Sequence, residues 1–321
     1  MRREPRPLRQ PETPDTLPTI AVPADVEFSV AWRFVLALAS VWFAIAVLKK
    51  RWWTLATFGF VGGALWRYAR HHEPARPTVV TRTISDSRWG DALEGFTIAQ
   101  ISDIHLGQPH SDENLEWTIG QLLTLRPDII VLTGDLVNNR PALSRLSMYL
   151  HRLHAPCGVY AIAGNHDYAE NIDDVRAALE FVGIPLLQNQ GKIVQYRGAS
   201  LWLAGVDDIW HGNIDIAAAV QSAPGDMPIV LLAHSPDTVR EASAHAAVVL
   251  QLSGHVHGGH IRLPLLGPLA RPRFGRLYTH GTQRVGSVHL HISLGLGGRP
   301  VRLGNPPELT FFRCVAERTI P

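Results

Sequence analysis

Residues 252–260 of this 321-residue chain read LSGHVHGGH, and this stretch is the strongest single indication of fold and function. It begins at the end of the apolar run 248–252, which is short and rich in β-branched residues and therefore predicts a buried strand. Directly after that run, His255 and His257 stand one residue apart among glycines that allow sharp turns. An isolated pair of this kind is more often structural, so its meaning depends on the rest of the chain.

Polar residues also follow the other predicted strands. From residue 82 onward, short apolar runs alternate with amphipathic stretches, which predicts an α/β sandwich domain over 82–321. Besides 248–252, we expect strands at 96–101, 129–132, 159–162, 201–204, 229–232, 287–292 and 309–314. Helices are expected from Ser111 to a stop at Pro127, over 143–150, from the cap at Asn171 to 181, and over 237–245.

The strand ends offer carboxylate, amide and imidazole groups. These residues are Asp103, His105, Asp135, Asn165, His166, His234, His255 and His257. Any one of them alone is more often a turn residue or a cap, but five strand ends that all supply ligand chemistry favour one shared metal site. A mixture of oxygen and nitrogen ligands favours Mn, Fe or Zn over Ca or Mg, which prefer oxygen alone.

The composition fits a globular protein that is not built to bind nucleic acid. Hydrophobic residues make up 46% of the chain, enough for one large domain with or without an appendage. The formal net charge of +2 is small for a dedicated nucleic-acid binder, so we expect no nucleic-acid partner. The two cysteines, Cys157 and Cys314, lie far apart and indicate neither a disulfide framework nor a cysteine zinc site. The oligomeric state is left open.

The amino-terminal region predicts a membrane anchor. Residues 1–27 are rich in proline, arginine and acids and are expected to form a flexible tail. The apolar segment 28–48, interrupted only by Arg33, is just long enough to cross a bilayer. A second apolar segment, 52–66, fits a second span, a re-entrant piece or an interfacial helix, so the anchor over 28–72 is one span or a helical hairpin. The flanking lysines and arginines favour a location of the domain over 82–321 on the cytoplasmic side of the inner membrane.

The chain resembles the calcineurin-like metallophosphoesterases from about residue 97 to its carboxyl end. The motifs that carry this resemblance are DIH at 103–105, GD at 134–135, GNHD at 164–167, His234 and GHVH at 254–257. Within that superfamily, the stretches GVDD, AHSPD, SGHVHGGHIRLP and RLGNPPE are most similar to a membrane-anchored bacterial branch of phosphodiesterases and UDP-2,3-diacylglucosamine hydrolase-like enzymes. The resemblance implies a four-layer α/β/β/α sandwich that holds two divalent metal ions.

The resemblance also implies how the ligands divide between the two ions. One ion is expected to bind Asp103, His105, Asp135 and His257, and the other to bind Asp135, Asn165, His234 and His255, so that Asp135 bridges them. Two cations about 3.5–4 Å apart activate a water that attacks phosphorus in line, so no protein nucleophile is needed. His166 is the expected general acid, because imidazole exchanges protons near pH 7; the alternative is a hydrogen bond to a ligand.

The chain departs from the family pattern at two positions. Relatives commonly carry an aspartate at the position of Asn138, where it orients the catalytic histidine. An amide can hold that ring but cannot stabilise its cation, and Asp167 is a candidate to compensate. His260 stands where relatives often carry glutamine, and it is expected either to contact substrate or to cover the site.

Six other residues are weaker candidates. We expect Asp207 and Asp208 to support the site from a loop without acting as ligands. Four arginines are expected to be solvated unless they meet phosphate or lipid head groups: Arg262, Arg273, Arg276 and Arg302.

The expected function is dimetal hydrolysis of a phosphodiester or pyrophosphate bond, on a lipid-linked substrate such as UDP-2,3-diacylglucosamine or a phospholipid. One alternative is a phosphatase or nucleotide phosphodiesterase that acts on soluble substrates at the membrane. Another is a non-catalytic membrane scaffold that retains the fold. The complete ligand set argues against the scaffold, and only Asn138 favours it.

Overall fold

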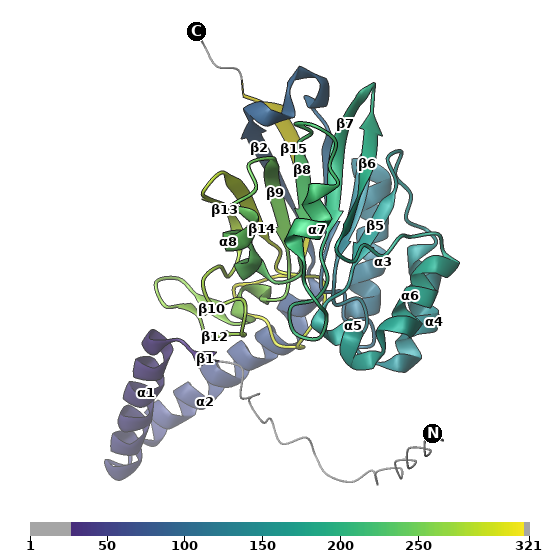
Figure 1. The fold of residues 1–321 in the computed structure, drawn as a ribbon. Helices are drawn as coiled ribbons and strands as arrows, with labels where there is room; N and C mark the ends of the chain where they lie inside the picture. The colour runs from purple at the N-terminus through teal and green to yellow at the C-terminus, as the bar shows by residue number, and fades with distance from the viewer. Residues whose placement is uncertain (1–26, 318–321) are drawn as a thin grey trace, which may run out of the picture.

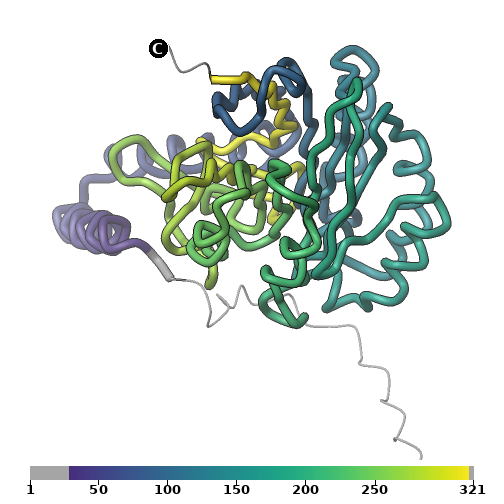
Figure 2. The backbone as a smooth tube through the Cα atoms, turned by 45° about the horizontal axis from the view of Figure 1, so that its top comes forward, coloured from purple at the N-terminus to yellow at the C-terminus, as the bar shows by residue number. Residues whose placement is uncertain are grey.

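The computed structural model describes residues 27–317, so the predicted tail lies outside the described residues except for Glu27. An α/β domain makes up most of the described chain, and an amino-terminal helical hairpin stands out to one side of it (Figures 1 and 2).

Two β-sheets form the centre of the α/β domain. The five-stranded sheet has the order β2-β15-β3-β4-β5, and the six-stranded sheet has the order β13-β14-β9-β8-β7-β6. The strands of the first are β2 (Thr78–Asp86), β15 (Glu308–Ala316), β3 (Thr97–Ile101), β4 (Ile129–Thr133) and β5 (Val159–Ile162). Those of the second are β13 (Gly281–Val285), β14 (Val288–Ile292), β9 (Val248–Ser253), β8 (Ile229–Leu232), β7 (Ala199–Gly205) and β6 (Gln190–Tyr196).

Helices cover the outer face of each sheet and complete four layers in the order α/β/β/α (Figure 1). They are α3 (Ser111–Leu125), α4 (Leu143–Leu150), α5 (Asn165–Glu170) and α6 (Ile172–Phe181) with the five-stranded sheet, and α7 (Ile216–Gln221) and α8 (Val239–Ala242) with the other. Three buried clusters fill the spaces between the layers. In β4, Ile130 packs towards the helices and Val131 towards the second sheet, so every residue of this strand is buried. The predicted fold class is confirmed.

Most predicted elements are present, with differences where the pattern was weak. The helix expected over 237–245 is replaced by a 3-10 turn (Pro236–Thr238) and the short α8. Strands β2, β6 and β13 were not predicted. In β6 only Val194 and Tyr196 are buried, so too few apolar residues mark it as a strand.

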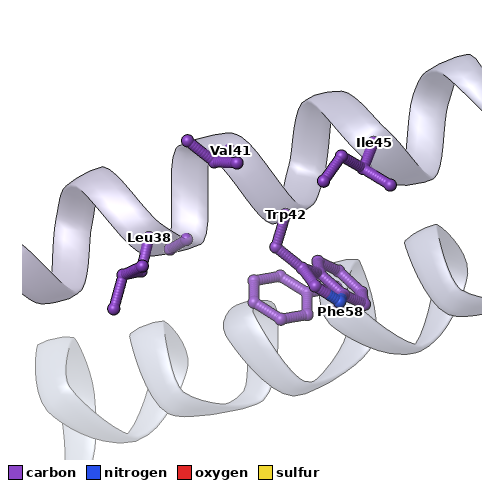
Figure 3. A pocket seen from close by; sticks show the side chains of 6 residues that line it. Leu38, Val41, Trp42, Ile45 and Phe58 are labelled. Carbon is purple, nitrogen blue, oxygen red and sulfur yellow. The ribbon is translucent and has the colours of Figure 1, made fainter.

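The amino-terminal hairpin consists of α1 (Val30–Leu48) and α2 (Trp52–Arg67). Helix α1 has 19 residues, about 28 Å of length, and is long and apolar enough to cross a bilayer. The two helices meet through Trp42 and Phe58, whose rings stack with centroids 5.0 Å apart, beside an apolar pocket that faces α2 (Figure 3). At 16 residues, α2 is shorter than α1 and has no buried residue, so its apolar side chains are exposed, as they are where a protein meets a membrane or a partner.

The end of the hairpin is built into the α/β domain. Helix α2 continues into a π-helical turn (Tyr68–His72), where the carbonyl of Ala69 accepts a hydrogen bond from the backbone N–H of Arg302 at 2.8 Å. The buried carboxylate of Glu73 accepts the backbone N–H of Asn305 at 2.6 Å. Strand β2 begins at Thr78, so Arg82, the expected start of the catalytic domain, lies inside this strand.

Candidate metal centre

The predicted strand ends meet at one edge of the sandwich. In the first sheet, the N–H of Asp103 donates to the carbonyl of Gly134 at 3.0 Å, which joins the loops after β3 and β4. Between the sheets, the N–H of His255 donates to Asp103 Oδ1 at 2.9 Å, which joins the loop after β9 to the loop after β3. Because β3, β4 and β5 are parallel, as are β7, β8 and β9, the carboxyl ends of the strands in each sheet lie together.

Side chains that could bind a metal ion form three groups at this edge. Within each group, the ligand atoms lie within 4.8 Å of one another and are buried or half-buried. The groups are Asp103 with His105 and His257, His105 with Asp135 and His166, and Asp135 with His234 and His255. Asp135 Oδ2 lies 3.5 Å from His105 Nε2 and 3.3 Å from His234 Nε2, between the first and last groups. A carboxylate in this position is able to bridge two cations.

Three of the imidazoles donate their outer N–H to a carbonyl oxygen. His234 Nδ1 lies 2.8 Å from the carbonyl of Thr133, and His255 Nε2 lies 2.9 Å from that of Arg273. His105 Nδ1 lies 3.2 Å from the amide oxygen of Asn138. In His105 and His255 the contact leaves a lone pair on the opposite ring nitrogen, which is the arrangement that metal-binding histidines commonly have, and His234 reaches it when it loses a proton.

One oxygen at this edge lacks a partner that a cation would supply. Asn165 Oδ1 is buried and forms no hydrogen bond within the described part of the chain. A buried polar atom without a partner costs free energy, and a bound cation would remove that cost. The residues therefore fit two divalent cations, with oxygen and nitrogen donors in both groups.

The backbone at this edge is strained. Six residues of the site that are not glycine adopt left-handed φ values between 47° and 71°: Asp103, His105, Asp135, His255, His257 and His260. Such conformations are rare outside glycine and concentrate at functional sites. The first residue of the GNHD motif, Gly164, has no room for a side chain. A Cβ there would lie 2.8 Å from His234 Nε2 and would clash with the Asp135 carboxylate.

The protonation states also suit metal binding. Burial lowers the pKa of His105 to about 3 and that of His255 to about 4, so both rings are neutral at pH 7. Burial opposes ionisation of Asp135, but His234 and His105 lower its pKa well below the usual range. The same carboxylate overcomes the effect of burial on His234 and raises the pKa of that ring to about 10. A cation that binds His234 must therefore displace a proton.

The side chains of Asn138 and Asp167 were expected to orient His166, but they form hydrogen bonds with other groups. In the described residues Asn138 hydrogen-bonds to His105, not to His166. The Asp167 carboxylate accepts the backbone N–H groups of Leu136, Val137 and Gly164 at 2.8, 3.2 and 2.9 Å, so it ties two motif loops together.

His166 is half-buried beside the donor groups. Its ring centroid lies 4.6 Å from that of His105, with the rings edge to face. Its backbone N–H donates to Asp135 Oδ1 at 2.9 Å. The ring is thus close enough to the donor atoms to meet a group bound between them.

The remaining candidates surround the centre. His260 packs on His257 with ring centroids 4.5 Å apart and accepts the backbone N–H of Arg299, so it covers part of the site. Asp207 and Asp208 accept N–H groups of the loop that they begin, at Asn213, Trp210 and His211.

The expectation of a solvated side chain is wrong for Arg302, which is 1% exposed. Its guanidinium donates to the carbonyls of Leu294, Gly295 and Asn305 and lies 3.3 Å from His257 Nδ1. Arg273 and Arg276 are exposed, and Arg262 is half-buried.

One part of the site was missed from the sequence. In the glycine-rich stretch 293–298, the N–H of Gly297 donates to the carbonyl of Asp103 at 2.7 Å, and a Cβ at Gly298 would lie 2.7 Å from the ring of His257. The sequence SLGLGG directly after a predicted strand was the signal that could have identified it.

Comparisons with known proteins agree with this geometry. The family model for the calcineurin-like phosphoesterases matches residues 96–259, which include all the expected ligands. The chain belongs to the calcineurin-like phosphoesterase family. It is therefore a metal-dependent phosphoesterase, of a family whose members use two metal ions.

Relatives with this domain include proteins of bacteria and animals. The metallophosphoesterase YkuE of Bacillus subtilis is 33% identical over 83% of this chain and 95% of its own length. A transmembrane protein with a metallophosphoesterase domain from Bos taurus is 31% identical over 73% of this chain and 56% of its own length. The UDP-2,3-diacylglucosamine pyrophosphatase LpxG of Chlamydia trachomatis is 27% identical over 78% of this chain and 93% of its own length. A transmembrane relative and the apolar helix α1 both fit a membrane protein.

Proposed function

We propose that this phosphoesterase is a membrane-anchored hydrolase that cleaves a phosphodiester or pyrophosphate bond in a lipid-linked substrate. The position of Asp135 Oδ2 between two groups of donors carries the dimetal part of the proposal. The apolar hairpin and the similarity to LpxG support a substrate such as UDP-2,3-diacylglucosamine or a phospholipid. We further propose that the catalytic domain faces the cytoplasm, because the segments on its side of the hairpin, 1–27 and 67–76, together carry seven arginines, against three cations in the turn 49–51.

Each of the two cations would be held by four residues, with Asp135 common to both. One would bind Asp103, His105, Asp135 and His257, and the other would bind Asp135, Asn165, His234 and His255. Mn, Fe or Zn is the proposed metal, because both groups mix imidazole with oxygen donors. When bound, the cations would supply the charge that activates a water and offsets the charge on the phosphoryl oxygens.

The protein's own residues would orient these donors and move a proton. Asn138 and the carbonyls of Thr133 and Arg273 hold three imidazoles with the opposite ring nitrogen directed towards the other metal-binding groups. His166 would donate a proton to the oxygen that leaves phosphorus, because its ring lies beside the donor groups and is half-buried.

The test compares two substrates on the same protein. The full chain, reconstituted in vesicles with Mn²⁺, should hydrolyse UDP-2,3-diacylglucosamine or a phospholipid in the bilayer, and it should also turn over bis(p-nitrophenyl) phosphate. If only the soluble ester and free nucleotides are cleaved, the lipid part of the proposal is wrong and the phosphoesterase assignment stands.

A further inference from the structure

Residues 261–277, which we call the interfacial lobe, lie between the first membrane helix and the metal centre. The lobe contains β10 (Arg262–Leu263), β11 (Gly267–Pro268) and β12 (Ala270–Arg271). Strands β10 and β11 form a hairpin that carries Leu265 at its tip, fully exposed and with a φ of 68°. A leucine held at the tip of a tight hairpin cannot be covered by its own segment.

The composition of the lobe suits an anionic surface. Its sequence, IRLPLLGPLARPRFGRL, has four arginines and no acidic residue. Leu277 is also more than half exposed, so apolar and cationic side chains are presented together. Segments of this kind bind membranes by inserting apolar side chains while arginines meet anionic head groups.

Contacts with α1 fix the lobe at the level where that helix would enter a bilayer. Phe28 pairs with Ala270 in a short antiparallel ladder, and the N–H of Ser29 donates to the carbonyl of Leu269 at 3.1 Å. In the first turn of α1, the indole N–H of Trp32 donates to the carbonyl of Gly267 at 3.1 Å. At the other end of the hairpin, Trp66 and Tyr68 are exposed, as is typical of aromatic residues at a membrane interface.

The lobe also forms part of the wall of the metal centre. The carbonyl of Arg273 accepts from His255 Nε2, and Pro268 lies so close to Gly259 that a Cβ there would be 2.6 Å away. The Arg273 guanidinium lies over the Phe274 ring at 4.8 Å, and Phe274 contacts Trp210. The edge of the site is therefore continuous with the exposed surface of the lobe.

We propose that the interfacial lobe docks on the head-group region of an anionic bilayer, with Leu265 inserted among the lipids. Docking in this way would hold the edge that carries the metal centre beside the head groups. A lipid-linked phosphate is then able to reach the donors without leaving the membrane. Only the access of a lipid-linked phosphate rests on the proposed function, since docking itself needs no catalysis.

The experiment measures the depth of a probe in the full chain. Cys157 is replaced by serine so that it takes up no label, and Cys314 is kept because it is buried. An environment-sensitive fluorophore is then attached at Leu265→Cys or, as the matched control, at Phe181→Cys. Phe181 is 84% exposed at the end of α6, on the side of the domain away from the hairpin (Figure 1). In vesicles of phosphatidylcholine with phosphatidylglycerol, we expect doxyl-labelled lipids to quench the probe at 265 severalfold more than the probe at 181. Quenching at 265 should fall in pure phosphatidylcholine and with Arg276→Glu.

Equal quenching at the two positions would overturn the proposal. A second result would also overturn it. If the emission of the probe at 265 is blue-shifted equally in detergent and in vesicles, and lipids do not quench it, the probe contacts protein and not the bilayer. The measurement is independent of turnover. A lobe that docks in a protein with no lipid hydrolase activity refutes the proposed substrate, and lipid hydrolysis with an unquenched probe refutes the docking.

Discussion

Asn138 offers the sharpest test of the metal centre, because the structure gives its side chain a different partner from the one that the sequence suggested. Its amide oxygen lies 3.2 Å from Nδ1 of His105, a ring that is buried between the two donor groups. Asn138→Leu keeps the volume and removes this acceptor. The ring N–H then remains buried without a partner, which costs about 1–3 kcal/mol.

That cost should appear as weaker metal binding. Loss of an acceptor behind a metal-binding histidine typically lowers affinity about 10–100-fold, and each tenfold corresponds to about 1.4 kcal/mol, so the two estimates agree. Isothermal titration of the metal-free full chain with Mn²⁺ measures the affinity directly. Asn138→Asp keeps an acceptor oxygen and should bind Mn²⁺ at least as tightly as the unmodified chain.

Asn139 provides the control. Its side chain caps a helical turn by accepting the N–H of Ala142 at 3.1 Å, so Asn139→Leu should lower stability by about 1 kcal/mol without weakening metal binding. The reasoning is refuted if Asn138→Leu lowers kcat and shifts its pH dependence while Mn²⁺ affinity is unchanged. That result would mean that Asn138 acts on His166.

Three further predictions concern activity and stability. Asp135→Asn should abolish turnover of bis(p-nitrophenyl) phosphate while circular dichroism stays unchanged, because the charge shared by both donor groups is lost; residual turnover above one per cent (~3 kcal/mol) would contradict this. Asp167→Ala should destabilise the domain by about 3 kcal/mol in urea unfolding, because three backbone N–H groups lose their acceptor, and a change below 1 kcal/mol would show that water replaces it. Burial disfavours the charged form of Asp86, but Arg88 lowers the pKa of that carboxyl to about 2, so the ion pair should contribute about 1–2 kcal/mol at pH 7, after allowance for screening. This contribution is complete above pH ~4 and is lost as the pH falls through about 2. Unfolding curves of Asp86→Asn and the unmodified chain should therefore differ at pH 6 and converge only below about pH 2; a difference independent of pH would exclude this origin.

The sequence predicted the α/β sandwich because its central strands are buried on both faces. Runs such as IIVLT in β4 are wholly apolar apart from the final threonine, and they stand out from any surface segment. Three of the four edge strands, β2, β6 and β13, were missed because few or none of their residues are buried. Strand β6 (QGKIVQY) has three apolar residues in seven, without a regular alternation, and contains a glycine, so its pattern resembles a loop.

The donors of the site were predictable because each follows a buried parallel strand. Their hydrogen-bond partners were not, because those contacts depend on side-chain directions that no linear pattern records. Asn138 and His166 lie on different loops, and only the folded backbone decides which ring the amide meets. Arg302 was misjudged for a similar reason, since an arginine whose partners are backbone carbonyls has no charged residue in the sequence to reveal its burial.

The contact between Ala69 and Arg302 bears on how a water-soluble version of this enzyme is best prepared. A chain trimmed to begin at residue 82 would lose the first half of β2, the Glu73 carboxylate that holds Asn305, and the carbonyl that holds the backbone of Arg302. The guanidinium of that arginine touches His257, so the damage would reach the catalytic edge. Cutting between Arg67 and Tyr68 removes both apolar helices and keeps every one of these supports.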